Sequence, residues 1–212
     1  MIIAVDGTLA SGKGTIARAL AKAFGLPCLD TGALYRGVAV AVLDAGADPH
    51  NCDEATQIAQ GFDPATIDEI KIRTSEAGSA ASIVSEHSGV RHALFDLQRR
   101  FARQAGGAVL DGRDIGTVIC PDANVKLFID AKPDIRAWRR WQELIDRGED
   151  IALTDIERQL VERDARDAGR ADAPMKPAQD ALLLDTSQLS IDAAINKAVE
   201  LVTDKTGVSP IT

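Results

Sequence analysis

The sequence predicts an α/β fold, a five-stranded parallel sheet flanked by helices, in a chain of 212 residues. Five short apolar runs, of the length and residue type of buried strands, alternate with segments in which apolar residues recur at helical spacing. A glycine-rich loop joins the first run to the first helical segment, as in phosphate-binding units. The predicted strands cover residues 2–6, 26–29, 108–110, 125–129 and 182–184.

The helical segments lie between these runs. The first is predicted over Lys13–Phe24, because Gly25 and Pro27 end its apolar pattern. Thr31 is the predicted N-cap of a second helix, which extends to residue 43. The remaining helices are expected at residues 54–60, 90–101 and 133–147, after a cap at Thr154, and at 191–202.

We expect a single domain with two appendages, because a chain of this length can form one sizeable core. Over residues 51–90 the periodicity weakens, which we interpret as an inserted substrate-binding subdomain. The segment at about 147–163 contains Gly148, Glu149 and Asp150 between two helices, with arginines on both sides. It is predicted to form a short lid.

Composition restricts the function classes. A net charge of −8 argues against a nucleic-acid or anionic-membrane surface. Cys28, Cys52 and Cys120 are far apart, so neither a disulfide framework nor a zinc site is indicated. The first apolar run is interrupted at Asp6 and no basic residues precede it, which does not resemble a signal peptide. We therefore expect a monomeric cytoplasmic protein that acts on small molecules.

The spacing of Gly7, Gly12 and Lys13 is that of a P-loop. Glycines allow successive backbone N–H groups to converge on phosphate oxygens, and the loop ends at a helix N-terminus, which favours an anion. Lys13 is expected to contact the β- and γ-phosphates of ATP, and the Thr15 hydroxyl to bind Mg²⁺, directly or through water. A glycine-rich turn without a ligand is the disfavoured alternative. The predicted ATP-binding residues are Gly7, Thr8, Leu9, Ala10, Ser11, Gly12, Lys13, Gly14 and Thr15.

Two more motifs follow predicted strands, and ligands of open α/β sheets bind at the carboxyl ends of strands. With two later segments, the motifs are Asp30-Thr31-Gly32-Ala33-Leu34-Tyr35-Arg36, Asp111-Gly112-Arg113-Asp114-Ile115-Gly116-Thr117, Pro121-Asp122-Ala123 and Glu162-Arg163-Asp164-Ala165-Arg166-Asp167 through Arg170. These four segments resemble the bacterial cytidylate kinases, P-loop nucleotide kinases, over most of the chain and in the same order. The resemblance implies transfer of the γ-phosphoryl group of ATP to CMP or dCMP, with Mg²⁺.

The same resemblance implies the roles of individual residues. Ser82 and Arg91 lie where the insertion meets the base, and Asp114 binds the cytosine. Phosphate is held by Arg36, Arg113 and Arg170, while Arg163 and Asp167 lie near the ribose, and Thr31 joins the substrate-binding set. The implied catalytic residues are Lys13, Arg113, Arg163 and Arg170. One departure concerns the P-loop: Thr8 and Leu9 stand where the family usually has proline or a small residue, which bears on the stiffness of the loop.

The residue types agree with a cytosine site. Cytosine presents an amino donor beside two acceptors, which suits a carboxylate such as Asp114 together with Arg91 and Ser82. Five further arginines are interpreted as solvating helix faces and pairing with neighbouring acids, although we expect one or two to touch ATP. These are Arg136, Arg139, Arg140, Arg147 and Arg158.

A stripe at helical spacing changes from apolar to charged. Its residues are Ile156, Leu160, Arg163, Asp167 and Arg170. We predict that this helix leaves the core and enters a polar cleft. The alternative is an exposed helix end with a surface pair of Arg163 and Asp167.

The expected chemistry needs no general base, because a nucleoside monophosphate is already a nucleophilic dianion at neutral pH. Asp111 is either a partner of the magnesium shell or a structural turn carboxylate. Two other functions stay open: a P-loop kinase for a different monophosphate or a hydroxyl acceptor, and a nucleotide-binding switch without phosphotransfer. The switch is disfavoured because Asn196-Lys197 continues as Ala198-Val199 and not as a guanine-reading Asn-Lys-x-Asp.

Overall fold

The computed structural model describes residues 1–211 and confirms the predicted α/β fold. One sheet contains five strands in the order β2-β3-β1-β4-β5. The pairs β1–β3, β1–β4 and β4–β5 are parallel, and Ile3 in β1 lies opposite Val109 on one side and Val125 on the other. The strands are β1 (Ile2–Gly7), β2 (Cys28–Asp30), β3 (Ala108–Gly112), β4 (Val125–Asp130) and β5 (Leu182–Asp185).

The helices follow the predicted order, with one addition. They are α1 (Lys13–Phe24), α2 (Thr31–Asp44), α3 (Cys52–Gln60), α4 (Ser75–Val84), α5 (Ser88–Ala102), α6 (Pro133–Asp146), α7 (Leu153–Gly169) and α8 (Ile191–Thr206). Helix α4 was not predicted. Its buried side chains include Ala77, Ala80 and Ala81, and alanines give little hydrophobic contrast to a sequence pattern.

Two predicted helix caps are wrong. The Asp30 side chain, and not Thr31, caps α2, because its carboxylate accepts a hydrogen bond from the Ala33 N–H at 3.1 Å. Thr31 is instead the first residue of the helix. Thr154 lies inside α7, whose N-cap position is occupied by Ala152.

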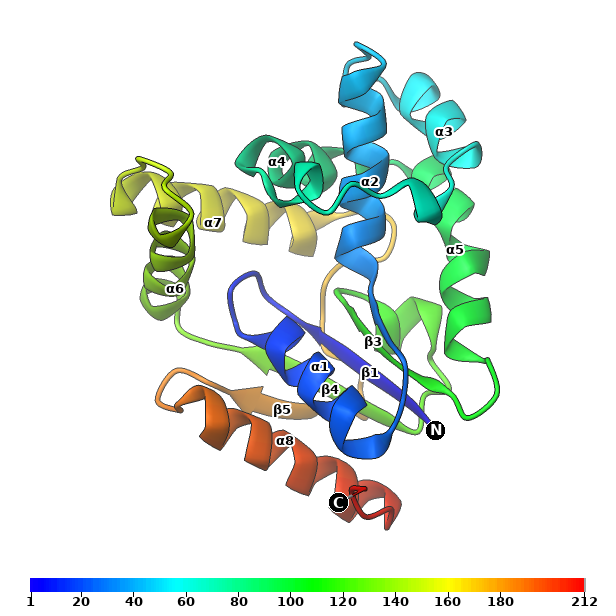
Figure 1. The fold of residues 1–212 in the computed structure, drawn as a ribbon, viewed down its shortest axis with the longest axis vertical. Helices are drawn as coiled ribbons and strands as arrows, with labels where there is room; N and C mark the ends of the chain where they lie inside the picture. Colours follow the sequence, from blue (N-terminus) through cyan, green and yellow to red (C-terminus); the bar gives the residue numbers. More distant parts are fainter. Residues whose placement is uncertain (212) are drawn as a thin grey trace. The chain divides into compact units, whose positions relative to one another are not determined.

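The chain forms two compact units, one of residues 1–29 with the chain from Ala102 onward, and one of residues 30–101. In the first unit, α1 and α8 pack against the sheet (Figure 1). Leu20 of α1 and Val202 of α8 join Val5 of β1 in its core. In the second unit, α2 packs against α3 and α4. This unit contains the predicted 51–90 segment, whose role in substrate binding stays a prediction.

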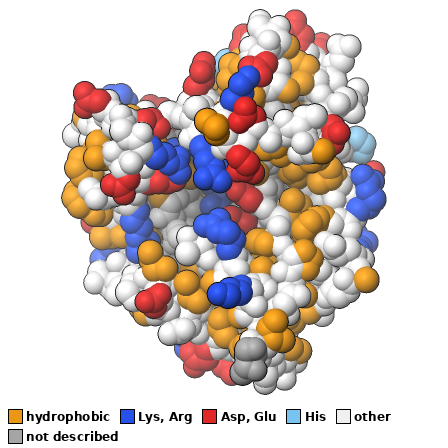
Figure 2. All heavy atoms as spheres, in the orientation of Figure 1, with side chains coloured by type: hydrophobic (Ala, Val, Ile, Leu, Met, Phe, Trp, Pro, Cys, Tyr) orange, Lys and Arg blue, Asp and Glu red, His pale blue; other side chains and the backbone are white. Residues whose placement is uncertain are grey.

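Charge is distributed without one dominant sign on the face drawn in Figure 2, where basic side chains of the described residues are interspersed with acidic and apolar ones. The expectation that no nucleic acid binds stays a prediction. Within residues 1–211, no helix combines the length and the apolar character needed to span a membrane.

Candidate active site

The glycine-rich loop leaves the central strand β1 and leads into α1. Its backbone requires residues that tolerate left-handed or otherwise unusual conformations. Gly7 has φ 148°, and a Cβ there would lie 1.9 Å from the carbonyl oxygen of Ile129. Ala10 has φ 61° although it is not glycine, a strained conformation of the kind that proteins retain at functional sites. No side chain among the described residues caps α1 at Gly12, and the start of a helix favours an anion.

Lys13 is held over this loop. Its ammonium group donates to the Thr8 carbonyl oxygen at 3.4 Å and lies 4.0 Å from Asp111 Oδ1 at the end of β3. The Asp111 carboxylate also lies against the loop backbone, because a Cβ on Gly14 would come within 3.0 Å of its Oδ2. The next residue, Thr15, is exposed. A lysine, a hydroxyl and a carboxylate therefore surround the start of α1.

These oxygens fit Mg²⁺. Magnesium binds one or two protein oxygens and takes its other ligands from phosphates and water. No group of three or more His, Cys, Asp or Glu residues in the described chain forms a metal site. Thr15 and Asp111 offer the sparse oxygen set that a nucleotide-bound ion needs.

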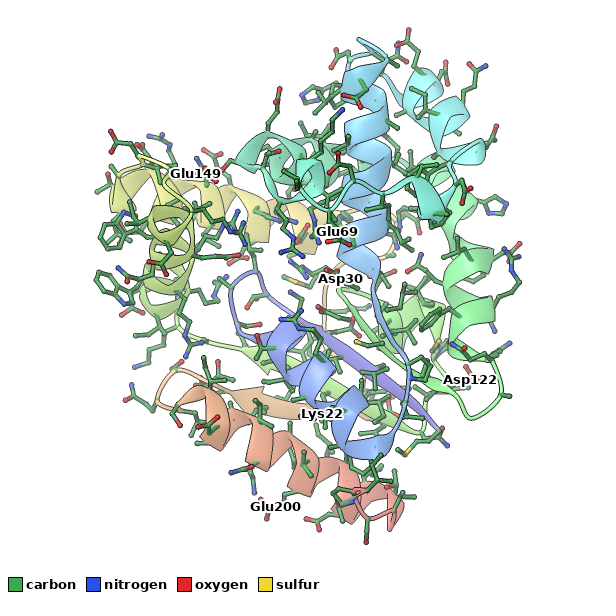
Figure 3. The ribbon with its side chains drawn as sticks, in the orientation of Figure 1. Lys22, Asp30, Glu69, Asp122, Glu149 and Glu200 are labelled. Carbon is green, nitrogen blue, oxygen red and sulfur yellow. The ribbon has the colours of Figure 1, made fainter. Side chains whose placement is uncertain are left out.

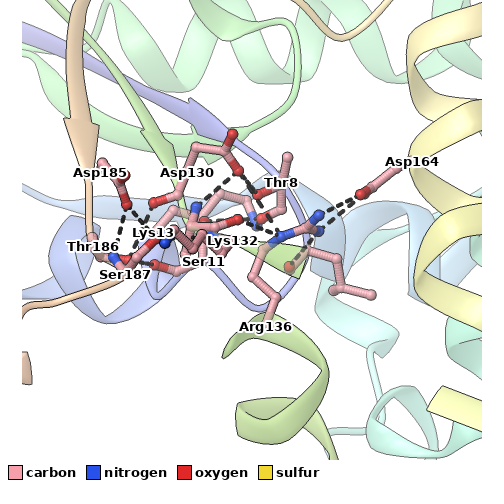
Figure 4. A network of polar contacts seen from close by, with 12 residues as sticks. Thr8, Ser11, Lys13, Asp130, Lys132, Arg136, Asp164, Asp185, Thr186 and Ser187 are labelled. Atoms are coloured by element: carbon pink, nitrogen blue, oxygen red, sulfur yellow. Dashed lines mark hydrogen bonds and ion pairs between the residues drawn. The ribbon is translucent and has the colours of Figure 1, made fainter. Parts of the chain in front are cut away.

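Three contacts anchor the P-loop to neighbouring elements of the same unit, and Figure 4 draws the two hydrogen bonds among them. The Thr8 hydroxyl donates to Asp130 Oδ1 at the end of β4, at 2.6 Å. The Thr186 hydroxyl, after β5, donates to the Ser11 carbonyl oxygen at 2.8 Å. The Leu9 side chain packs against the small core formed by α6 and α7. The two residues that depart from the family pattern thus each make a specific contact.

Arg136 corrects the interpretation of the five arginines as surface residues. It is 3% exposed, donates to the Leu9 carbonyl oxygen at 3.3 Å, and pairs with Asp164 of α7 at 2.5 Å. Arg139 also leaves the predicted pattern, because it donates to the carbonyl oxygen of Thr186 at 2.7 Å. The other three pair with nearby acids as predicted: Arg140 and Arg147 with Glu143, and Arg158 with Asp155. That one or two of the five touch ATP stays a prediction.

At the charged end of the α7 stripe the Asp167 carboxylate is buried, and that this end enters a polar cleft stays a prediction. Ile156 and Leu160 lie in the core, and the side chain of Asp167 is 1% exposed. The alternative of an exposed surface pair is therefore excluded. The stripe ends at Arg170, the C-cap residue of α7.

Three arginines surround the Asp167 carboxylate. Arg113 Nε donates to it at 3.1 Å, Arg170 donates to its other oxygen, and Arg163 Nε lies 3.9 Å away. Burial by itself raises the pKa of Asp167, but the attraction of Arg113, Arg170 and Arg163 outweighs burial and holds the pKa below its usual value. Three guanidinium groups thus gather around one carboxylate, and guanidinium groups are well suited to phosphate oxygens.

Asp114 follows Arg113 after β3 and is buried. The π-helical turn η3 (Ile115–Ile119) begins immediately after it, and the Asp114 side chain caps none of its described N–H groups. Instead, the Ile115 and Gly116 N–H groups donate to Asp6 at 2.8 and 2.7 Å. Asp6 was missing from the predicted site residues. The available signal was a charged residue in an apolar strand, directly before the P-loop.

The second unit contains the other predicted substrate-binding residues. Arg36 pairs with Asp30 at 2.9 Å, and Thr31 is buried. Asp30, labelled in Figure 3, lies at the start of α2. The Arg91 guanidinium lies over the ring of Tyr35, 5.9 Å from its centroid.

Ser82, on α4 of the second unit, is 2% exposed, and its hydroxyl has no hydrogen-bond partner among the described residues. A buried hydroxyl without a hydrogen-bond partner costs free energy. That a substrate atom supplies this partner stays a prediction.

A parallel sheet with a P-loop after its central strand places the chain among the P-loop α/β proteins. This fold is shared by an uncharacterized protein from Eubacterium ventriosum, with a TM-score of 0.52 at 16% identity. The match covers 95% of this chain and 98% of that one. A gluconokinase from Sinorhizobium meliloti does so with a TM-score of 0.50 at 15% identity, over 96% of this chain and 91% of that one.

Sequence similarity defines the family. The chain belongs to the cytidylate kinase family, whose model matches residues 3–204. A cytidylate kinase from Xanthobacter autotrophicus is 55% identical over 204 residues, covering 95% of this chain and 97% of the relative. One from Caulobacter vibrioides is 51% identical over 203 residues, with coverage of 96% and 95%. The predicted family resemblance is therefore confirmed.

Proposed function

We propose that this chain is a cytidylate kinase, which transfers the γ-phosphoryl group of ATP to CMP or dCMP and releases ADP with CDP or dCDP. The observation that carries the proposal is the presence of two anion-binding features in one compact unit of a family member. The P-loop suits the donor phosphates, and the positive cluster of Arg113, Arg163 and Arg170 around Asp167 suits the acceptor phosphate. We also propose that the enzyme is monomeric and cytoplasmic.

The chemistry requires charge screening more than proton transfer. An oxygen of the acceptor phosphate dianion attacks the γ-phosphorus, and the bond from that phosphorus to the bridging oxygen breaks, so ADP leaves with the electron pair. Lys13 contacts the β- and γ-phosphates, where negative charge increases in the transition state. Arg113 and Arg170 hold the acceptor, and Asp167 keeps both guanidinium groups in place.

Magnesium is the proposed cofactor, with Thr15 and Asp111 as its protein-side partners. The ion supplies charge neutralisation on the donor phosphates. The segment at about 147–163 is proposed to exclude water as a competing acceptor.

Base recognition is proposed for three buried polar residues: Asp114, Ser82 and Arg91. Asp114 would accept from the cytosine amino group, while Ser82 and Arg91 would serve the acceptor atoms of the ring. Arg36 and Thr31 are proposed to bind the monophosphate, and Arg163 and Asp167 to lie near the ribose. These assignments follow the family resemblance.

An ADP-release assay with ATP, Mg²⁺ and a panel of acceptors tests the proposal. The panel contains CMP, dCMP, UMP, AMP and shikimate. We expect CMP and dCMP to be used in clear preference to the others. Preferred turnover of a different monophosphate or of shikimate would replace the acceptor assignment, and ATP binding without turnover of any acceptor would favour a binding module.

A further inference from the structure

Asp6 lies at the carboxyl end of β1, directly before the P-loop, but its side chain contacts the turn that follows β3. The residue is 4% exposed. Its two carboxylate oxygens each accept one backbone hydrogen bond, Oδ1 from Ile115 at 2.8 Å and Oδ2 from Gly116 at 2.7 Å. One carboxylate therefore connects the strand that leads into the P-loop to a turn 109 residues further along the chain.

The turn that Asp6 holds is unusual. In η3 the Ile119 N–H donates to the Asp114 carbonyl at 3.2 Å and the Cys120 N–H to the Ile115 carbonyl at 2.6 Å, each across five residues. Such π-turns are rare and occur frequently at functional sites. The turn follows Asp114, whose backbone (φ −142°, ψ 22°) is not helical. The direction of the Asp114 side chain thus depends on how η3 is held.

A side chain on Gly116 would crowd this contact. A Cβ at this position would lie 3.3 Å from Asp6 Oδ2 and 3.1 Å from Lys126 Cδ. Gly116 therefore lets the backbone approach the carboxylate closely, and Lys126 closes the other side while pairing with Asp180 at 2.8 Å. The contact thus depends on the two carboxylate oxygens of Asp6 and on the small size of Gly116.

A carboxylate is costly at this position. Burial raises the pKa of Asp6 to about 7, the hydrogen bonds from Gly116 and Ile115 oppose this rise, and the nearby Asp114 and Asp111 add to it. Only a carboxylate offers two oxygen acceptors on one short side chain, whereas asparagine offers one oxygen and an amino donor. A buried carboxyl group whose ionisation is disfavoured is a local conflict of the kind that proteins keep at functional positions.

We propose that Asp6 is a positioning residue for acceptor recognition, which fixes Asp114 and Arg113 relative to the P-loop by holding both N–H groups at the start of η3. This inference rests on the proposed function, because it concerns the residues assigned to the acceptor. It assigns to Asp6 a role in acceptor selectivity that is separate from ATP binding.

The test compares Asp6→Asn with wild type in three measurements: kcat/KM for CMP, the ratio of kcat/KM for CMP to that for UMP, and ATP affinity by calorimetry. Asparagine keeps the size but turns an amino group toward a backbone N–H. We expect kcat/KM for CMP and the CMP to UMP ratio each to fall by roughly tenfold or more. ATP affinity should stay within about twofold, because the P-loop contacts are untouched.

The matched control is Asp185→Asn. Asp185 also ends a strand and accepts a backbone N–H, from Ser187 at 2.8 Å, but it is exposed. This variant should retain the CMP to UMP ratio. If Asp6→Asn does not fold, Gly116→Ala disturbs the same contact with Asp6 in place, and we expect the same fall in the ratio.

Three results would overturn the proposal: an unchanged ratio in a folded Asp6→Asn, an unchanged ratio in Gly116→Ala, or a loss of ATP affinity equal to the loss of CMP use. Failure of the proposed function would give a different result, seen in the wild-type enzyme itself. Wild type would then prefer another acceptor, and the same comparison would be made with that acceptor.

Discussion

Arg113 Nε lies 3.1 Å from Asp167 Oδ2, across 54 positions of sequence, and the Asp167 side chain is 1% exposed. The pair joins the residue after β3 to the end of α7. Arg170 donates to the other oxygen of the same carboxylate. Asp167 is therefore the common acceptor that orders two guanidinium groups, which we propose to bind the acceptor phosphate.

Asp167→Asn should destabilise the fold at pH 7. The substitution removes the negative charge that the buried arginines face, which in a fully buried ion pair costs about 3 to 5 kcal/mol. Because Arg113 and Arg163 are partly solvated, we expect a smaller loss, about 2 to 3 kcal/mol in the free energy of unfolding. Urea unfolding curves measure this difference. Asp155→Asn, which removes an exposed partner of Arg158, should cost less than about 1 kcal/mol.

The stability difference between wild type and Asp167→Asn should depend on pH. The pKa of Asp167 is lower in the folded than in the unfolded chain, so its ionisation contributes stability that is fully present above the unfolded pKa. That contribution is lost as the pH falls through the folded value, below about 4. The difference between wild type and Asp167→Asn should therefore shrink below pH 4. A difference of the same size at pH 7 and pH 3 would contradict this account.

Lys13→Ala should lower kcat by at least about 100-fold, because its charge is needed most as negative charge develops near the β–γ bridge. Lys22→Ala is the matched control, since Lys22 lies on the same helix but in its last turn and exposed (Figure 3). Thermal melting should show both variants folded. Near-normal turnover in folded Lys13→Ala would remove the P-loop from the mechanism.

The elements that the sequence predicted well have local signals. The five strands are short and apolar, because a parallel sheet is covered on both faces, and α1 ends at Gly25 in a left-handed conformation. The spacing of Gly7, Gly12 and Lys13 is equally local. By contrast, α4 was missed because its buried residues are mostly alanines.

The site residues that the sequence did not predict depend on long-range contacts. Arg136 looks like a surface residue in its helix, but the Leu9 carbonyl oxygen and Asp164 surround it in the folded unit. Asp6 has no partner near it in sequence, because its hydrogen-bond donors lie more than 100 residues away. Spacing along the chain cannot reveal either role.

Asp114→Asn tests base recognition directly. Uracil presents an acceptor where cytosine presents its amino group, so the carboxylate should repel UMP while it attracts CMP. We expect transition-state binding of CMP to weaken by roughly 1 to 3 kcal/mol, measured as kcat/KM, while UMP falls less or improves. Asp122→Asn, which alters an exposed pair with Arg103, should leave the CMP to UMP ratio unchanged. An equal loss for both nucleotides in folded Asp114→Asn would leave selectivity to Ser82 and Arg91.

Thr8→Val removes the hydroxyl that ties the P-loop to β4, while the side chain keeps its shape. Thr8 donates to Asp130 at 2.6 Å, and a hydrogen bond of this kind contributes about 1 kcal/mol or more. The half-exposed Asp130 can turn to water instead, so the expected consequence is a less ordered loop. We predict that the dissociation constant for ATP rises by about three- to tenfold, measured by calorimetry.

A double-mutant cycle with Asp130→Ala separates this contact from general damage. If the hydroxyl acts through Asp130, both substitutions remove the same interaction. The double variant should then bind ATP with about the same affinity as the single variant that binds ATP less tightly. Additive losses would show that Thr8 and Asp130 act independently. In that case the Thr8 hydroxyl would not stiffen the loop. The stiffness would then come from the contact of Leu9 with α6 and α7, at the positions where the family usually has proline or a small residue.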